Sequence, residues 1–226
     1  MILHIRELNS SNIELLKLLA AFFMTIDHVN KYLFNSTLIL CYELGRMSMP
    51  IFMFIFAYNL AKNLNFEKVI RRLILYGSIT TPIFINLGGL YYGYFPLNIM
   101  FTLLVSACVM YHIDKNIYLA LLLFVVGGAV VEYWWTSISF SVFIFMFYRS
   151  KNILFFILAI ISIALLYCIN SNFWALASIP TIYILSLLNL KISRLKNFFY
   201  IYYFVHLAVI FSIKVWMQTK GYIFFY

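Results

Sequence analysis

The chain has 226 residues, of which 65% are hydrophobic and 10% are charged, and its formal net charge is +9. A soluble domain carries roughly a quarter charged residues, so this composition excludes a soluble globular protein. The apolar residues form long continuous stretches and lack the alternation of barrel strands. We therefore predict an all-α, polytopic membrane helix bundle that occupies residues 1–226 as one domain.

Nine apolar runs follow one another along the chain, separated by short connections. A membrane-spanning helix needs about 20 apolar residues, and most of these runs approach that length. The runs near 97–112 and 135–148 are short for a full span, so eight or ten spans also fit the pattern. The nine runs cover residues 13–33, 38–61, 69–87, 97–112, 116–131, 135–148, 152–168, 173–190 and 198–217.

Basic residues occupy alternate connections between the runs. Positive residues beside membrane spans face the cytoplasm, so the pattern predicts a multi-pass protein of the cell inner membrane, with its N-terminus inside and its C-terminus outside. The intervening connections, near 34–37, 88–96, 132–134 and 169–172, hold no Lys or Arg. This distribution indicates a lipid bilayer and no nucleic acid as the partner. The basic residues are Arg6, Lys62, Lys68, Arg71, Arg72, Lys115, Arg149, Lys151, Lys191, Arg194 and Lys196.

The first run carries ionisable residues at positions inside the membrane. Such a side chain costs at least a few kcal/mol within a span, so it faces the bundle interior or marks a site. Lys17 and His28 are eleven residues apart, which places them on nearly the same helix face, ~16 Å apart along the axis. An Asp27-His28 pair suits general-base chemistry, because a neutral imidazole accepts a proton near neutral pH. The alternative interpretation is a polar helix end in which Asp27 pairs with Lys31.

Arg46 opens the second run at a depth similar to that of His28. It either stabilises an anionic reaction intermediate or forms a structural ion pair with Glu43 or Asp27. Both interpretations place a buried guanidinium beside a carboxylate or an oxyanion.

Further polar residues fall at related depths in later runs. Asn98 and Thr102 lie one turn apart at the start of the fourth run, and Glu132 lies at the outer end of the fifth. His206 lies near the middle of the last run, with Tyr203 one turn earlier. Each of them is either a structural hydrogen-bonding group or part of a polar pathway.

Several blocks, taken together, resemble the TraX family of conjugative-pilin acetylases over nearly the whole chain. The family's Gly after Asp-His is Asn30 here, and its Pro before the last His is replaced at residues 204–205. The resemblance implies an acetyl-CoA-dependent acyltransferase that acts on the N-terminal amine of a pilin subunit or on another surface acceptor. The blocks are Lys17, Met24-Thr-Ile-Asp-His-Val29, Gly45-Arg-Met-Ser-Met-Pro50, Asn98-Ile-Met-Phe-Thr-Leu103 and Lys196-Asn-Phe-Phe-Tyr-Ile-Tyr-Tyr-Phe-Val-His206.

The spacing of Lys17 and His28 also resembles the Arg-x10-His pattern of the broader membrane acyltransferase family three. That resemblance implies that His28 is the general base, that acetyl-CoA is the donor, and that the acyl group reaches an acceptor at the outer side. Lys17 would stand where that family has Arg, with the same charge but without the bidentate fork.

We expect Asp27 to orient the base, and Arg46, with Asn98 and His206, to stabilise the oxyanion. Thr102, Glu132 and Tyr203 complete the expected substrate site, and no metal is expected because Cys41, Cys108 and Cys168 are far apart. Two other functions remain open, a transporter or ion pathway and a non-enzymatic partner in membrane assembly. The acceptor group, amine or hydroxyl, and an acetyl-histidine intermediate also remain open.

Overall fold

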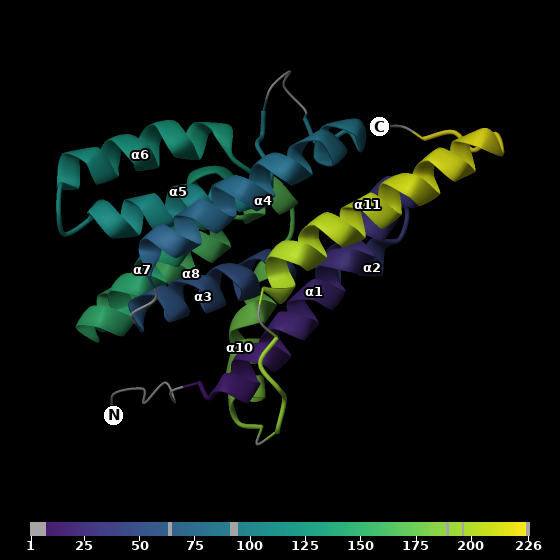
Figure 1. The fold of residues 1–226 in the computed structure, drawn as a ribbon. Coiled ribbons are helices and arrows are strands. Elements are labelled where there is room, and N and C mark those ends of the chain that lie inside the picture. The colour runs from purple at the N-terminus through teal and green to yellow at the C-terminus, as the bar shows by residue number, and fades with distance from the viewer. Residues whose placement is uncertain (1–7, 63–64, 91–94, 189, 196, 225–226) are drawn as a thin grey trace.

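The computed structural model describes residues 8–62, 65–90, 95–188, 190–195 and 197–224 (Figure 1). Within these ranges the protein is all-helical, as predicted, with one isolated β-bridge between Leu97 and Val131 and no strand. The predicted cytoplasmic residues Arg6 and Lys196 lie outside the described residues. The helices are α1 Ser10–Leu33, α2 Ile39–Gly45, α3 Ser48–Ala61, α4 Phe66–Asn86, α5 Ile99–His112, α6 Ile117–Val130, α7 Trp134–Ser150, α8 Ile153–Ala164, α9 Tyr167–Asn170, the 3-10 helix η1 Trp174–Ala177, α10 Ser178–Ser186 and α11 Phe198–Thr219.

Every predicted apolar run corresponds to one helical segment, and three of these segments are interrupted. Helix α2 passes into α3 through a tight turn at Arg46 and Met47, α9 follows α8 closely, and η1 leads into α10. The described part of the chain therefore holds nine segments, whose ends lie within a few residues of those predicted.

Three of the described segments are long and apolar enough to cross a membrane, by length and composition: 39–61, 153–170 and 198–219. The segments 99–112, 117–130 and 174–187 are apolar but shorter. Helices α1 and α4 are long, but charged residues interrupt their apolar stretches. The segments support a membrane protein, whereas the number of crossings and the orientation of the N-terminus stay predictions.

Asparagine side chains define where many of the helices begin. A helix leaves its first backbone N–H groups without partners, and an Asn side chain just before it can accept from one of them. Helices α1, α4, α5, α6 and α8 are capped in this way by Asn9, Asn65, Asn98, Asn116 and Asn152.

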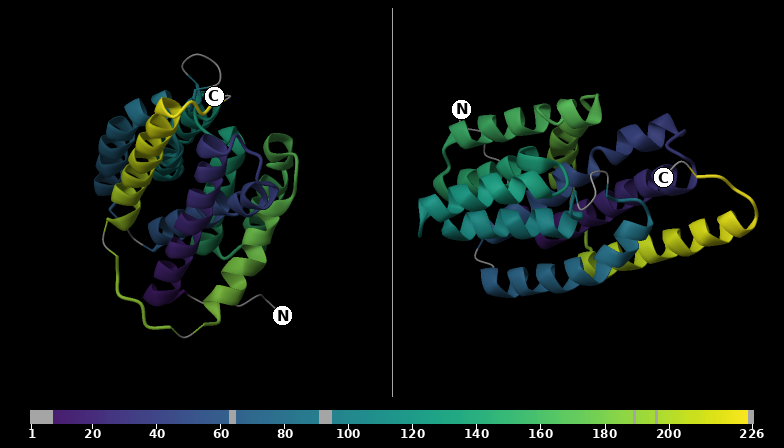
Figure 2. Two further views of the ribbon diagram at one scale, coloured as in Figure 1. Left: turned by 90° about the vertical axis from the view of Figure 1, so that its right-hand side faces the viewer. Right: turned by 90° about the horizontal axis from the view of Figure 1, so that it is seen from above.

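Helix α1 lies in the middle of the bundle (Figures 1 and 2). It packs against α2, α3, α10 and α11, and α11 also packs against α4. Helix α7 packs against α3, α5 and α8. Figure 2 shows α8 on the opposite side of the molecule from α4 and α11. This arrangement brings α1, α3, α4 and the start of α11 around one interior space.

Candidate functional site

A cavity of about 990 Å³ lies between the helices and opens to the surface, where exposed side chains such as Lys68 and Arg194 line it. Its walls come from α1, α3, α4, α5 and α11, and from the connection between α6 and α7. The lining on α1 runs from Ser10 to His28, which is ~27 Å at 1.5 Å per residue. Five of the predicted site residues line this cavity: Lys17, Asp27, His28, Glu132 and Tyr203.

His28 of α1 contacts His206 of α11 directly at the cavity wall. The distance from His28 Nδ1 to His206 Nε2 is 2.8 Å, and the two ring planes are nearly parallel, 9° apart, with their centroids 5.0 Å apart. His206 is 6% exposed, whereas His28 is half-buried and lines the cavity. The expected role of His206 at an oxyanion is not supported by this position, because its Nε2 faces the other histidine.

Tyr202 supports the histidine pair from the same helix. Its backbone oxygen lies 2.9 Å from His206 Nδ1, and its ring stacks on the His206 ring with centroids 5.3 Å apart. The Tyr202 hydroxyl lies 2.5 Å from Thr25 Oγ1, and Thr25 donates its own proton to the Ala21 backbone oxygen at 2.8 Å. The Tyr202 O–H is therefore the donor to Thr25. Helices α1 and α11 are thus joined at two points, one turn apart.

Asp27 forms an ion pair with Arg46, and no hydrogen bond joins it to His28 among the described residues. Arg46 also donates from Nε to the Tyr42 backbone oxygen at 3.2 Å and from Nη1 to Asn170 Oδ1 at 3.3 Å. Arg46 is absent from the described cavity lining. This geometry corresponds to the structural alternative for Arg46, and any effect of Asp27 on the orientation of the base is indirect.

Gly45 permits the close approach of α2 to α1 at this ion pair. A Cβ atom built on Gly45 would lie 2.7 Å from both Cγ and Oδ1 of Asp27, closer than real Cβ atoms come. Any side chain at this position would therefore displace the Asp27 carboxylate from Arg46. Gly45 thus allows α2 to approach Asp27 closely, and the next residue, Arg46, supplies the cation that pairs with the Asp27 carboxylate.

Asn98 and Thr102 are fully buried but do not line the cavity. Asn98 Nδ2 donates to the Gly77 backbone oxygen at 3.1 Å and to Thr81 Oγ1 at 3.0 Å. Thr102 Oγ1 donates to the Glu132 backbone oxygen at 3.1 Å. The two residues thus hold α4, α5 and the α6–α7 connection together, and their expected direct roles in the substrate site are not supported by their positions.

The connection between α6 and α7 places Glu132 and Tyr133 on the cavity wall. Tyr133 and Trp134 have φ values of 59° and 50°, in the left-handed region that costs non-glycine residues free energy. The Glu132 backbone N–H donates to the Leu97 oxygen at 3.1 Å, which helps to hold this turn. Burial raises the pKa of the Glu132 carboxyl, which lies outside the helical segments, to about 7. The sequence did not single out Tyr133, because no sequence pattern marks its backbone conformation.

Five cations also line the cavity, among largely apolar side chains. Lys17 pairs with Glu14, whose Oε1 lies 2.9 Å from the Lys17 Nζ. The others come from the α3–α4 region and from the chain that precedes α11. We call this set the basic end of the cavity: Lys17, Lys62, Lys68, Arg72 and Arg194.

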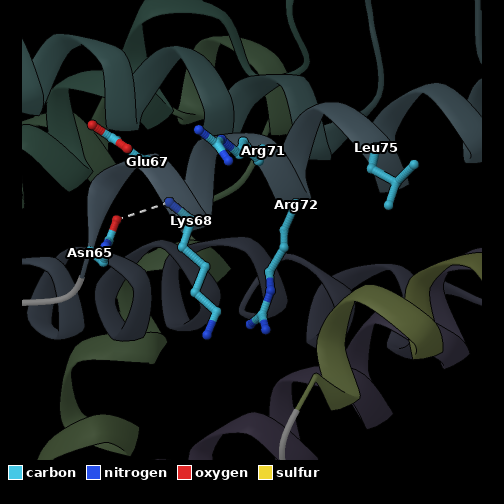
Figure 3. A pocket seen from close by; sticks show the side chains of 6 residues that line it. All are labelled: Asn65, Glu67, Lys68, Arg71, Arg72 and Leu75. Atoms are coloured by element: carbon cyan, nitrogen blue, oxygen red, sulfur yellow. Dashed lines mark hydrogen bonds between the residues drawn. The ribbon is translucent and has the colours of Figure 1, made fainter.

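Two residues of the basic end lie one turn apart on α4. Figure 3 shows that the side chains of Lys68 and Arg72 extend to the same side of the helix, whereas Glu67 and Arg71 extend to the other. All four line a shallow surface pocket of about 380 Å³, but only Lys68 and Arg72 also line the large cavity. The i, i+4 spacing of Lys68 and Arg72 in the sequence is the signal that could have identified this face.

Arg194 reaches the basic end because the start of α1 holds the preceding chain segment. Asn12 Nδ2 donates to the backbone oxygens of Leu185 and Leu188 at 2.7 and 2.8 Å. The Ile192 backbone N–H donates to Ser11 Oγ at 3.2 Å. Asn12 is 2% exposed, so these hydrogen bonds are shielded from solvent.

The described residues include no group of three or more His, Cys, Asp or Glu side chains placed to hold a metal ion. The candidate site therefore consists of an apolar helical bundle, a histidine pair, an ion pair behind it and a basic end. These features define a helical membrane protein with an internal polar site.

Comparison with known proteins assigns the family. The model of the family described as TraX protein matches residues 12–214, so the chain belongs to the TraX family, which is associated with pilin acetylation in conjugation. A protein of Rickettsia prowazekii (strain Madrid E), described as uncharacterized protein RP591, is 33% identical over 104 residues. That match covers 46% of this chain and 38% of the relative's own length. No solved structure matches the chain.

Proposed function

We propose that the protein is an acetyltransferase of the cell inner membrane that moves acetyl from cytoplasmic acetyl-CoA to an acceptor at the outer side. The family association makes the N-terminal amine of a pilin subunit the favoured acceptor. The observation that carries the proposal is one cavity whose wall includes both a set of cations and a half-buried histidine.

The basic end suits the phosphate-bearing part of acetyl-CoA. Phosphate oxygens are bound by Arg and Lys side chains through charge-assisted hydrogen bonds. Lys68, Arg72 and Arg194 make no ion pair with any described residue, so they can serve a ligand. From there the linear arm of the donor would follow α1 and bring the thioester to His28.

His28 would act as the general base, with its free Nε2 as the proton acceptor. The acceptor nitrogen attacks the thioester carbonyl carbon, the new C–N bond forms, and the N–H proton passes to His28. When the oxyanion collapses, the C–S bond breaks and the thiolate leaves with its electron pair. The thiolate then takes the proton from His28, so the products are the acetylated amine and the free thiol of CoA.

The developing oxyanion needs hydrogen-bond donors on the cavity wall. Neither Arg46 nor Asn98 lines the cavity, and both N–H groups of Asn98 Nδ2 already donate to α4. Tyr203 and Tyr133 both line the cavity, and the Tyr203 ring centroid lies 5.5 Å from that of His206. Their hydroxyl groups are the donors that we assign to this role.

A His28→Ala variant tests the function. General-base catalysis contributes about 10²- to 10⁴-fold, so transfer should fall by a factor in that range. The matched control is His112→Ala, because His112 contacts the Cys108 backbone oxygen on α5 and lies off the cavity. Intact mass of pilin from cells with each variant reports the transfer, and full acetylation by His28→Ala would refute the proposal.

Purified protein in detergent distinguishes the enzyme from a transporter. An acetyltransferase should modify its acceptor without any membrane gradient. Transfer that occurs only in sealed vesicles would favour the transport function.

A further inference from the structure

We infer that His206 is a positioning residue that holds the proton of the His28 ring on Nδ1 and so keeps His28 Nε2 free to act as the base. The inference rests on the proposed function for its catalytic consequence. Its structural content, a single tautomer of His28, can be measured separately from any activity.

The chain of hydrogen bonds fixes the direction of each donor. A backbone carbonyl oxygen only accepts hydrogen bonds, so the His206 Nδ1 that lies 2.9 Å from the Tyr202 oxygen must carry a proton. In a neutral imidazole the other nitrogen then has a lone pair, and His206 Nε2 is an acceptor. The His28 Nδ1 that lies 2.8 Å from it must therefore be the donor. His28 Nε2 is left with the lone pair.

The surroundings of His28 agree with this assignment. Among the described residues His28 Nε2 has no hydrogen-bond partner, and His28 lines the cavity. His206 is buried, its Nε2 faces His28 Nδ1, and the Tyr202 ring lies nearly parallel to its ring with the centroids 5.3 Å apart. The Tyr202 hydroxyl bond to Thr25 fixes the α11 backbone against α1 at the turn that carries the accepting carbonyl. The Tyr202 backbone oxygen, which accepts from His206 Nδ1, is thus held in place.

The tautomer matters because a free imidazole exchanges its proton between the two nitrogens. If Nε2 carried the proton, it could donate but could not take the proton of the attacking amine. When His28 takes that proton and becomes a cation, its Nδ1–H bond to His206 becomes charge-assisted and stronger. His206 therefore supports both the resting base and its protonated form without contacting the substrate.

The experiment compares His206→Leu with His206→Gln. Leucine offers no acceptor, so kcat should fall by about 10- to 100-fold while KM for acetyl-CoA stays within about twofold, since the base and not the donor site is affected. The Gln side chain amide can present an oxygen to His28 Nδ1, so His206→Gln should recover most of kcat. His112→Leu is the control, because it makes the same change at a histidine that contacts the Cys108 backbone oxygen on α5 and lies off the cavity, and it should keep kcat.

The second readout is the 15N NMR spectrum of His28 in protein labelled at histidine. The wild-type ring and the His206→Gln ring should show a protonated Nδ1 and an unprotonated Nε2, whereas His206→Leu should show both tautomers. A wild-type His28 protonated on Nε2, or a His206→Leu variant with unchanged kcat, would overturn the inference. If His206→Leu fails to fold, the wild-type spectrum and His206→Gln decide the matter. If wild-type protein transfers no acetyl group, the proposed function fails while the spectrum still tests the tautomer.

Discussion

Replacing Arg72 by Gln removes one cation from the basic end of the cavity. A guanidinium and a phosphate about 4 Å apart attract each other by about 1 kcal/mol in bulk water and by about 4 kcal/mol at an effective dielectric constant of 20. Arg72 is half-buried, so we expect a loss toward the lower limit, about 1–2 kcal/mol. This loss corresponds to about a 5- to 30-fold rise in KM for acetyl-CoA. The value of kcat should change little, because the contact is present in both ground and transition states.

Arg71→Gln provides the matched control. It removes the same charge from the neighbouring residue of the same helix, but Arg71 is exposed, extends to the other side of α4 and does not line the cavity (Figure 3). Acetyl transfer by purified protein, measured over a range of acetyl-CoA concentrations at two salt concentrations, compares the two variants. The KM of Arg71→Gln should match that of the wild type, and the gap between the variants should shrink at high salt. An equal rise in KM for both variants would refute the reasoning, because it would reflect the general surface charge alone.

Three further substitutions test the residues behind the cavity wall. Gly45→Ala places a methyl group against Asp27 and should lower the free energy of unfolding in detergent by about 1–3 kcal/mol. Arg46→Ala leaves Asp27 without its partner and should cost about 3–5 kcal/mol, part of which a second change of Asp27 to Asn should recover. Glu132→Gln should raise Tm most above pH 7, because the raised pKa means that the folded protein disfavours the carboxylate, and the gap should close as the pH falls through about 7 toward 4.5. An unchanged unfolding free energy for either of the first two, or a gap independent of pH for the third, would contradict the assignment concerned.

The helical segments were predictable because their signal is simple. The length of each apolar run sets the length of the segment, and a capping Asn before the run or a turn after it sets the boundary, so the nine runs match the nine described segments. The interruptions within segments were not predictable in the same way. The turn at Arg46 and Met47 lies inside a single predicted apolar run. Pro50 follows it in the first turn of α3, where the missing N–H of proline costs no intrahelical hydrogen bond.

The candidate site was predictable in its residue types but only partly in their partners. The predicted depth identified Lys17, Asp27, His28, Glu132 and Tyr203, all of which line the cavity. The same criterion identified four residues that are absent from the described lining: Arg46, Asn98, Thr102 and His206. Their hydrogen-bond partners come from residues distant in the chain, which a single sequence does not bring together. The contact between the two histidines, for example, joins residues 178 positions apart.

Asn98 shows a signal that the sequence contained and that pointed to another role. It directly precedes an apolar helical run, which is the position where an Asn side chain caps a helix. The structure places it there, with its Oδ1 accepting from the Met100 backbone N–H at 3.1 Å. Helix capping is therefore sufficient to explain a polar residue directly before an apolar run, without a role in binding substrate.

Asp27 and His28 are neighbours in the sequence but serve different purposes, because successive helix residues point about 100° apart. Asp27 meets Arg46 and Gly45 of the second segment, and this contact fixes the rotation of α1 about its own axis. The same rotation directs His28 toward His206 and the cavity. Asp27 therefore acts on His28 through the orientation of the helix. A change at Asp27 that loosens the ion pair should disturb the histidine pair even though no bond joins the two side chains.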